Sequence, residues 1–146
     1  MQTAVEGGPD QRVSRIYPGD ITAPARARHF CAEHLSQVLG SSTAAQDMIA
    51  DLVLVTSELV TNAFNAGSHE ICVDLCRHGD RIQLAVHDHS TQLPAIREAA
   101  AHEDRGRGLA IVASIAGGWQ VEQTHDGKVV WLDFELSEEF RSAAPS

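Results

Sequence analysis

The sequence lacks any excess of positive charge, since Lys and Arg together number 11 against 20 Asp and Glu, a formal net charge of -9. Non-specific binding to nucleic acid needs a basic face that replaces the counterions along the phosphates, and this balance argues against one. The acidic balance also disfavours an anionic membrane surface. No apolar run approaches the roughly 18 residues that a membrane-spanning helix needs. We therefore expect neither direct contact with nucleic acid nor association with a membrane.

Cysteine is scarce as well. The three cysteines, Cys31, Cys72 and Cys76, are an odd number without close pairing, which favours reduced thiols over a disulfide framework. The first residues, MQTAVEGGPDQ, show neither the basic stretch nor the apolar stretch of a secretory signal. These features together predict a cytoplasmic protein.

What the sequence does contain is typical of one globular domain. Of its 146 residues, 43% are hydrophobic and 21% are charged, as in an ordinary single-core protein. Residues 1–20 are polar and rich in Gly and Pro, and we expect a flexible lead there with one short strand at 12–17. The domain is expected over 20–136, followed by a polar tail at 137–146.

Helices dominate the first half of the expected domain. Apolar residues recur every three or four positions from Pro24 to Leu39 and again from Thr43 to about Gly67, which predicts two amphipathic helices. Thr43 to Gln46 has the pattern of a capping box. A shorter apolar helix is expected at 108–116.

The second half changes to the two-residue period of strands. Residues 71–76 and 81–86 are predicted to form one hairpin, and 119–125 with 128–135 a second one around Asp126-Gly127. This order predicts an α/β (α+β) two-layer sandwich. Its mixed, mostly antiparallel sheet would be covered on one face by about three helices.

Two polar residues interrupt the apolar pattern of the second helix. Glu58 and Asn62 are four positions apart and so project from the same helical face. They could form an ordinary hydrogen bond on a solvated surface. Alternatively, the carboxylate could accept a proton from a nucleophile while the amide oxygen coordinates Mg²⁺, a cation that prefers oxygen ligands.

Asp88 stands at the end of an apolar strand and is a second candidate. It could form a turn through its own backbone, or it could accept a hydrogen bond from an exocyclic amine such as that of adenine. His87 and His89 beside it do not predict zinc, because no third ligand is evident.

A third feature is Arg105-Gly106-Arg107-Gly108-Leu109, which precedes the expected helix at 108–116. Glycines let backbone N–H groups approach an anion closely, and a helix N-terminus favours negative charge. Taken alone, the pattern is also compatible with a simple turn before a helix.

In this order, the three features resemble the ATP-binding domain shared by DNA gyrase B, Hsp90, sensor histidine kinases and MutL, known as the Bergerat fold. The chain is most similar to the small anti-sigma-factor serine kinases of partner-switching systems. Residues 57–63 (SELVTNA) match the N box of that family, residues 106–112 (GRGLAIV) match its G2 box, and residues 127–131 (GKVVW) resemble its closing strand. The resemblance covers roughly residues 20–136.

The resemblance implies a role for each candidate residue. Asn62 would bind Mg²⁺ and Glu58 would be the general base. Asp88 would accept a hydrogen bond from the adenine amino group of ATP. Residues 89–105 would form a lid over the nucleotide. The residues that would frame the lid and contact the phosphates are Gly106, Arg107, Gly108 and Leu109.

The resemblance also implies a function. The chain would be a Mg-ATP-dependent serine kinase that phosphorylates an anti-anti-sigma protein of the STAS type and sequesters a sigma factor, with homodimerisation usual among the relatives. However, Ser90 and Gln92 stand where this family normally has the glycines of its G1 box. These substitutions favour an alternative, a non-catalytic module that binds its partner on the same fold with little or no nucleotide. Glu58 favours the kinase, since a pure binding module has no need of a base.

Overall fold

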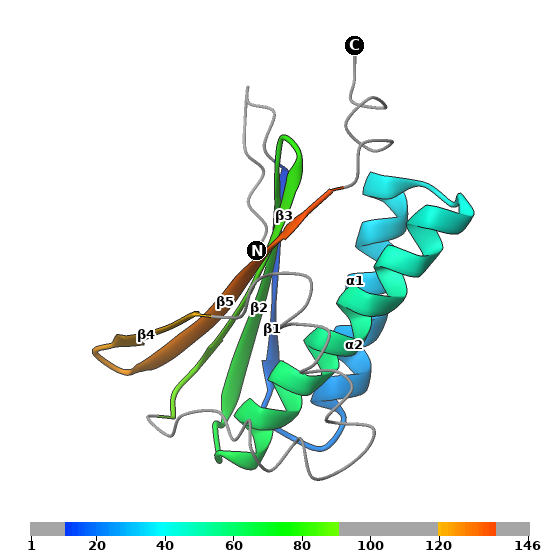
Figure 1. Cartoon of the computed structure of the whole chain (residues 1–146). Coiled ribbons are helices and arrows are strands. Elements are labelled where there is room, and N and C mark those ends of the chain that lie inside the picture. Colours follow the sequence, from blue (N-terminus) through cyan, green and yellow to red (C-terminus); the bar gives the residue numbers. More distant parts are fainter. Residues whose placement is uncertain (1–10, 91–119, 137–146) are drawn as a thin grey trace, which may run out of the picture.

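The computed structural model describes residues 11–90 and 120–136, which form a five-stranded sheet with two helices on one side (Figure 1). The strand order is β1-β2-β3-β5-β4, and every neighbouring pair is antiparallel. The strands are β1 (Gln11–Pro18), β2 (Glu70–His78), β3 (Arg81–Asp88), β4 (Gln120–Thr124) and β5 (Gly127–Glu135), and the helices are α1 (Ala23–Leu39) and α2 (Thr43–Asn65). The predicted two-layer α+β sandwich is confirmed.

Several details differ from the expectation. The short strand expected at 12–17 is the edge strand β1, paired with β2 along its whole length, so the sheet begins before residue 20. The sheet was expected to be mixed, but all its described pairs are antiparallel. The helix predicted at 108–116 lies outside the described residues.

The start of α2 lies one residue earlier than the predicted capping box implies. The cap is Ser42, whose backbone is extended and whose Oγ accepts the N–H of Ala45 at 3.1 Å. Gln46 does reach back, but its Nε2 donates to the carbonyl of Ser41 at 3.1 Å. The assignment of Thr43 as the cap is therefore wrong, because the hydroxyl of the adjacent Ser42 accepts the free backbone N–H of Ala45 instead.

The core lies between the helices and the sheet. α1 packs on β1 and β2, and α2 packs on β2 and β3. Alternate residues of β2 and β3 point toward the helices, and Ile71, Val73, Leu75, Ile82, Leu84 and Val86 on this side are buried. The largest fully buried side chains include Leu35, Leu52, Leu75, Leu84, Leu132 and Phe134.

The opposite face of the sheet carries the residues of the other parity, among them Cys72, Asp74 and His87. Ser14 donates a hydrogen bond to Asp74, and His87 Nε2 lies 3.4 Å from the second oxygen of the same carboxylate.

Neither α1 nor α2 combines the length and the apolar character that crossing a bilayer requires.

Candidate functional site

Glu58 and Asn62 lie on α2, on the side of the helix turned away from α1. Thr56 faces α1, because its hydroxyl lies 3.4 Å from the thiol of Cys31. Glu58 follows two positions later, about 200° further around the helix. Its side chain is nevertheless buried, with a relative exposure of 7%, whereas Asn62 is half-buried. A carboxylate and an amide are thus held one turn apart near the C-terminal end of α2.

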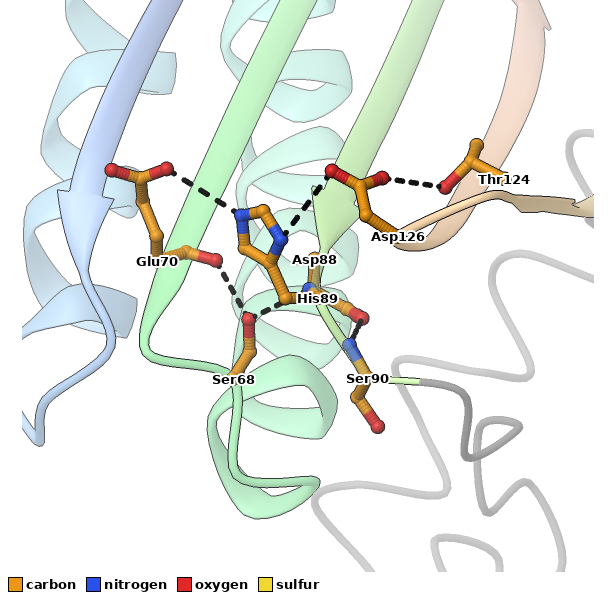
Figure 2. A network of polar contacts seen from close by, with 7 residues as sticks. All are labelled: Ser68, Glu70, Asp88, His89, Ser90, Thr124 and Asp126. Atoms are coloured by element: carbon orange, nitrogen blue, oxygen red, sulfur yellow. Dashed lines mark hydrogen bonds and ion pairs between the residues drawn. The ribbon is translucent and has the colours of Figure 1, made fainter.

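Hydrogen bonds attach this end of α2 to the end of β3. The backbone N–H of Ser68 donates to the carbonyl of Ala63 in the last turn of the helix, at 3.2 Å. The hydroxyl of Ser68 in turn accepts the backbone N–H of His89 at 3.0 Å (Figure 2). Asp88 therefore lies at the same end of the sandwich as Asn62, with the connection running through one buried serine.

His89 extends this network to two more segments (Figure 2). Its Nε2 lies 3.5 Å from a carboxylate oxygen of Glu70 at the start of β2, and its Nδ1 lies 3.8 Å from Asp126 in the β4–β5 turn. Thr124 donates to Asp126 at 3.1 Å, and this hydrogen bond lowers the pKa of the Asp126 carboxyl. The network gathers the ends of β2, β3 and β4 around Asp88.

Asp88 itself is held by a buried ion pair. Lys128 Nζ lies 3.0 Å from Oδ1 and 2.9 Å from Oδ2 of Asp88. Oδ1 also accepts the backbone N–H of Ser90 at 2.8 Å. The side chains of Lys128 and Asp88 are only 3% and 2% exposed. The carboxylate of Asp88, which was predicted to bind a ligand, is thus bonded to the ammonium group of Lys128.

The pairing of Lys128 with Asp88 was not predicted from the sequence. Lys128 is the only lysine in the chain, and it is the register partner of Asp88 across β3 and β5. The signal was present, because Lys128 alternates with the apolar residues Val130 and Leu132 and so occupies a core position. A charge at such a position requires a partner, but the partner is identifiable only from the strand register.

The structure brings together some of the predicted site residues. Glu58 and Asn62 on α2 lie at the end of the sandwich where β3 ends in Asp88. The predicted phosphate-contacting residues, Gly106, Arg107, Gly108 and Leu109, lie outside the described residues. So do Gln92 and all but the first two residues of the lid expected at 89–105.

A hollow of about 220 Å³ adjoins Asp88 and Lys128. Its other walls are Glu70, Cys72, His87, His89, Thr124 and Asp126. Desolvation and the nearby carboxylates of Asp74 and Glu70 raise the pKa of the Cys72 thiol to about 11. Within residues 11–90 and 120–136, no three His, Cys, Asp or Glu side chains are arranged to hold a metal ion.

These residues fit Mg-ATP at one end of the site only. The amide of Asn62 provides a hard oxygen atom of the kind that Mg²⁺ prefers, and the carboxylate of Glu58, one turn earlier, is a group that can accept a proton. At the other end, both oxygens of Asp88 are bonded to Lys128. Asp88, which was expected to bind the amino group of adenine, is therefore bonded to an ammonium group in this structure.

The comparison with known families decides the assignment. The sequence profile of the histidine kinase-like ATPase domain matches residues 17–134. The chain belongs to this family. The description of the family as an ATPase domain implies nucleotide binding. No functionally curated protein sequence matches the chain.

Solved structures show the same fold. One is the structure of the RsbU and RsbW domains of Rv1364c from Mycobacterium tuberculosis, which aligns over 87% of this chain with a TM-score of 0.63 and 22% identity. The chain spans 33% of that protein, or about a third of its length. The histidine kinase AdeS of Acinetobacter baumannii aligns over 85% of this chain and 68% of its own, with a TM-score of 0.50 and 12% identity. At these identities the likeness concerns the fold alone.

Proposed function

We propose that the chain is a Mg-ATP-dependent serine kinase of a partner-switching system. It phosphorylates a serine of a STAS-type anti-anti-sigma protein and sequesters a sigma factor when that protein does not compete. Membership of the histidine kinase-like ATPase family, over residues 17–134, supports the nucleotide-binding part. The similarity to a structure that contains an RsbW domain agrees with the partner-switching part.

The observation that carries the kinase proposal is Glu58. This residue lies within α2 and is only 7% exposed, and a buried carboxylate is stable only with a polar or charged partner. A module that only binds a partner has no use for it. In the proposed reaction the Glu58 carboxylate accepts the proton of the attacking serine hydroxyl, which is general-base catalysis.

The other residues of the proposed site hold the cation and the nucleotide. Asn62, one turn after Glu58, supplies an oxygen ligand for the cation. Bound Mg-ATP supplies the phosphoryl group, and the cation neutralises charge on it. Asp88 faces the base end of the site, where Lys128 now holds it.

A second candidate function is favoured by that same ion pair. If Lys128 keeps Asp88 occupied permanently, the domain is a non-catalytic module that holds its partner without nucleotide. Ser90, in place of a G1-box glycine, fits this alternative because its buried side chain occupies space where glycine would let the backbone approach a nucleotide closely.

Nucleotide binding separates the two candidates first. In a thermal-shift titration with Mg-ATP, ligand at 100 times its dissociation constant adds about 2.7 kcal/mol of stability. A shift supports the kinase, and no shift at millimolar Mg-ATP supports the module. Incubation with labelled ATP and serine-containing STAS proteins then tests phosphoryl transfer directly.

Variants assign the roles. Glu58→Gln should retain nucleotide binding and slow transfer by about 100-fold or more, because a general base is lost. Asn62→Ala should remove the Mg²⁺ dependence of binding. Ser57→Ala is the matched control, since Ser57 lies beside Glu58 but accepts a hydrogen bond from Arg28 of α1 at 3.0 Å. Normal transfer by Glu58→Gln would refute the base assignment.

A further inference from the structure

The position of Lys128 has a consequence for base recognition. Asp88 ends β3 and Lys128 is the second residue of β5, and the two are direct register partners. Both lie on the helix-facing side of the sheet, because they share the parity of Val86 and Val130. The lysine thus enters the site from the strand beside the one that carries the acid.

The ion pair uses most of the bonding capacity of Asp88. A carboxylate offers about four acceptor positions. Lys128 Nζ occupies one on each oxygen, at 3.0 and 2.9 Å. The backbone N–H of Ser90 occupies another on Oδ1, at 2.8 Å. The carboxylate that would select an amino group is therefore almost fully engaged.

The backbone holds the pair in this register. A Cβ atom built on Gly127 would lie only 1.9 Å from the carbonyl oxygen of Asp88, so β5 approaches the end of β3 as closely as glycine allows. Rotation of the lysine side chain away from Asp88 would leave a buried charge without its partner, which is costly.

We propose that Lys128 determines the base selectivity of the nucleotide site, so that this chain binds purine triphosphates without selecting adenine. The inference rests on the proposed nucleotide binding. An adenine amino group is a donor and needs an acceptor, but Lys128, itself a donor, already occupies Asp88. A purine with a carbonyl group at the same ring position can instead accept from the ammonium.

The test compares Mg-ATP with Mg-ITP, which carries an oxo group in place of the 6-amino group. Dissociation constants are measured by calorimetry for the wild type, for Lys128→Ala and for Arg81→Ala. Arg81 is the matched control, because it also lies on β3–β5, where its guanidinium is 3.9 Å from Asp133, and because its loss changes the net charge equally. Circular dichroism confirms that each variant is folded.

The wild type and Arg81→Ala should bind Mg-ITP at least as tightly as Mg-ATP, because the ammonium group of Lys128 can donate a hydrogen bond to the oxo group. Lys128→Ala should prefer Mg-ATP by about tenfold or more, because a hydrogen bond to a charged group discriminates by at least that factor. A tenfold preference for Mg-ATP in the wild type overturns the inference while leaving the proposed kinase intact. So does an unchanged ratio in folded Lys128→Ala.

The wild-type arm stays decisive even where Lys128→Ala does not fold, since the ratio for the natural chain alone can contradict the inference. Binding of Mg-ATP by Lys128→Ala alone, with no binding of either nucleotide by the wild type, also overturns it, because the natural chain then binds no purine triphosphate. Absence of binding of either nucleotide to any variant refutes the proposed nucleotide binding itself, and the inference with it.

Discussion

Ser68 joins the end of α2 to the end of β3, because its hydroxyl accepts the backbone N–H of His89 at 3.0 Å while donating to the carbonyl of Glu70 at 2.7 Å. The side chain is buried, with 3% of the residue exposed. One hydroxyl thus satisfies two backbone groups next to Asp88. The relative position of the helix that carries Glu58 and the strand that carries Asp88 depends on it.

Ser68→Ala should therefore lower the free energy of unfolding by about 1–3 kcal/mol, because it leaves buried backbone groups without a partner. Ser36→Ala is the control, since Ser36 is exposed and its hydroxyl bonds only within α1, to the carbonyl of Glu33. Ser36→Ala should lower the free energy of unfolding by at most about 0.5 kcal/mol. Urea denaturation followed by tryptophan fluorescence measures both, and equal losses would contradict the role of Ser68.

The Asp88–Lys128 pair predicts strong energetic coupling. Asp88→Asn and Lys128→Met should each lower the free energy of unfolding by about 3–5 kcal/mol, because each removes one partner and leaves the other charge buried and uncompensated. The double variant should lose much less than the sum. Denaturation of all four proteins gives the coupling energy.

The exposed pair of Arg81 and Asp133 on the same two strands provides the comparison. Their nearest charged atoms are 3.9 Å apart, and the side chains are 57% and 35% exposed. Because solvent screens such a pair, its coupling should stay below about 1 kcal/mol. Similar coupling at the two positions would show that the Asp88–Lys128 pair does not behave as a buried one.

Much of the fold could be predicted from the sequence because its signals are local. The periods of the two helices and the hairpin turn at Gly79, which has a φ of +57°, depend only on neighbouring residues. The cap of α2 was placed one residue late because Ser42 and Thr43 both carry hydroxyls. Backbone conformation alone distinguishes them, and Ser42 is the extended one.

The candidate site was only partly predictable, because its geometry depends on register. Glu58 and Asn62 follow from helical spacing alone. Asp88 and Lys128 are forty positions apart in the sequence. Their pairing depends on the register of β3 and β5, which no local sequence pattern predicts. The same limit hid the role of Ser68, which acts on His89 through a tertiary contact.

Cys72 should react slowly with alkylating agents. Its thiol is half-buried, and desolvation together with Asp74 and Glu70 raises its pKa to about 11. Because the thiolate is the nucleophile, the rate should rise about tenfold per unit between pH 8 and pH 10. Mass spectrometry of digested protein separates Cys72 from Cys31, which is fully buried. A rate that levels off by pH 9 would contradict the raised pKa.

The lowered pKa of Asp74 leads to a prediction of how the stability of the fold depends on pH. Burial pulls the pKa of this carboxyl upward, but the hydrogen bonds from His87 and Ser14 outweigh it and lower the pKa below the usual 3.8. A lowered folded pKa means that the ionised form stabilises the fold. This stabilisation is complete above the unfolded pKa and is lost as the pH falls through the folded one.

Asp74→Asn should therefore be less stable than the wild type by about 1–2 kcal/mol at pH 7. The difference should shrink as the pH falls below about 4, where the wild-type carboxyl also becomes protonated. Urea denaturation at pH 7, 4 and 3 measures it. Glu122→Gln removes an exposed carboxylate from the edge strand β4, which does not adjoin β2, and should show little difference from the wild type at any of these pH values. A gap for Asp74→Asn that is the same at pH 3 and pH 7 would mean that the charge on Asp74 contributes nothing to the fold, and that Ser14 and His87 bind its neutral form equally well.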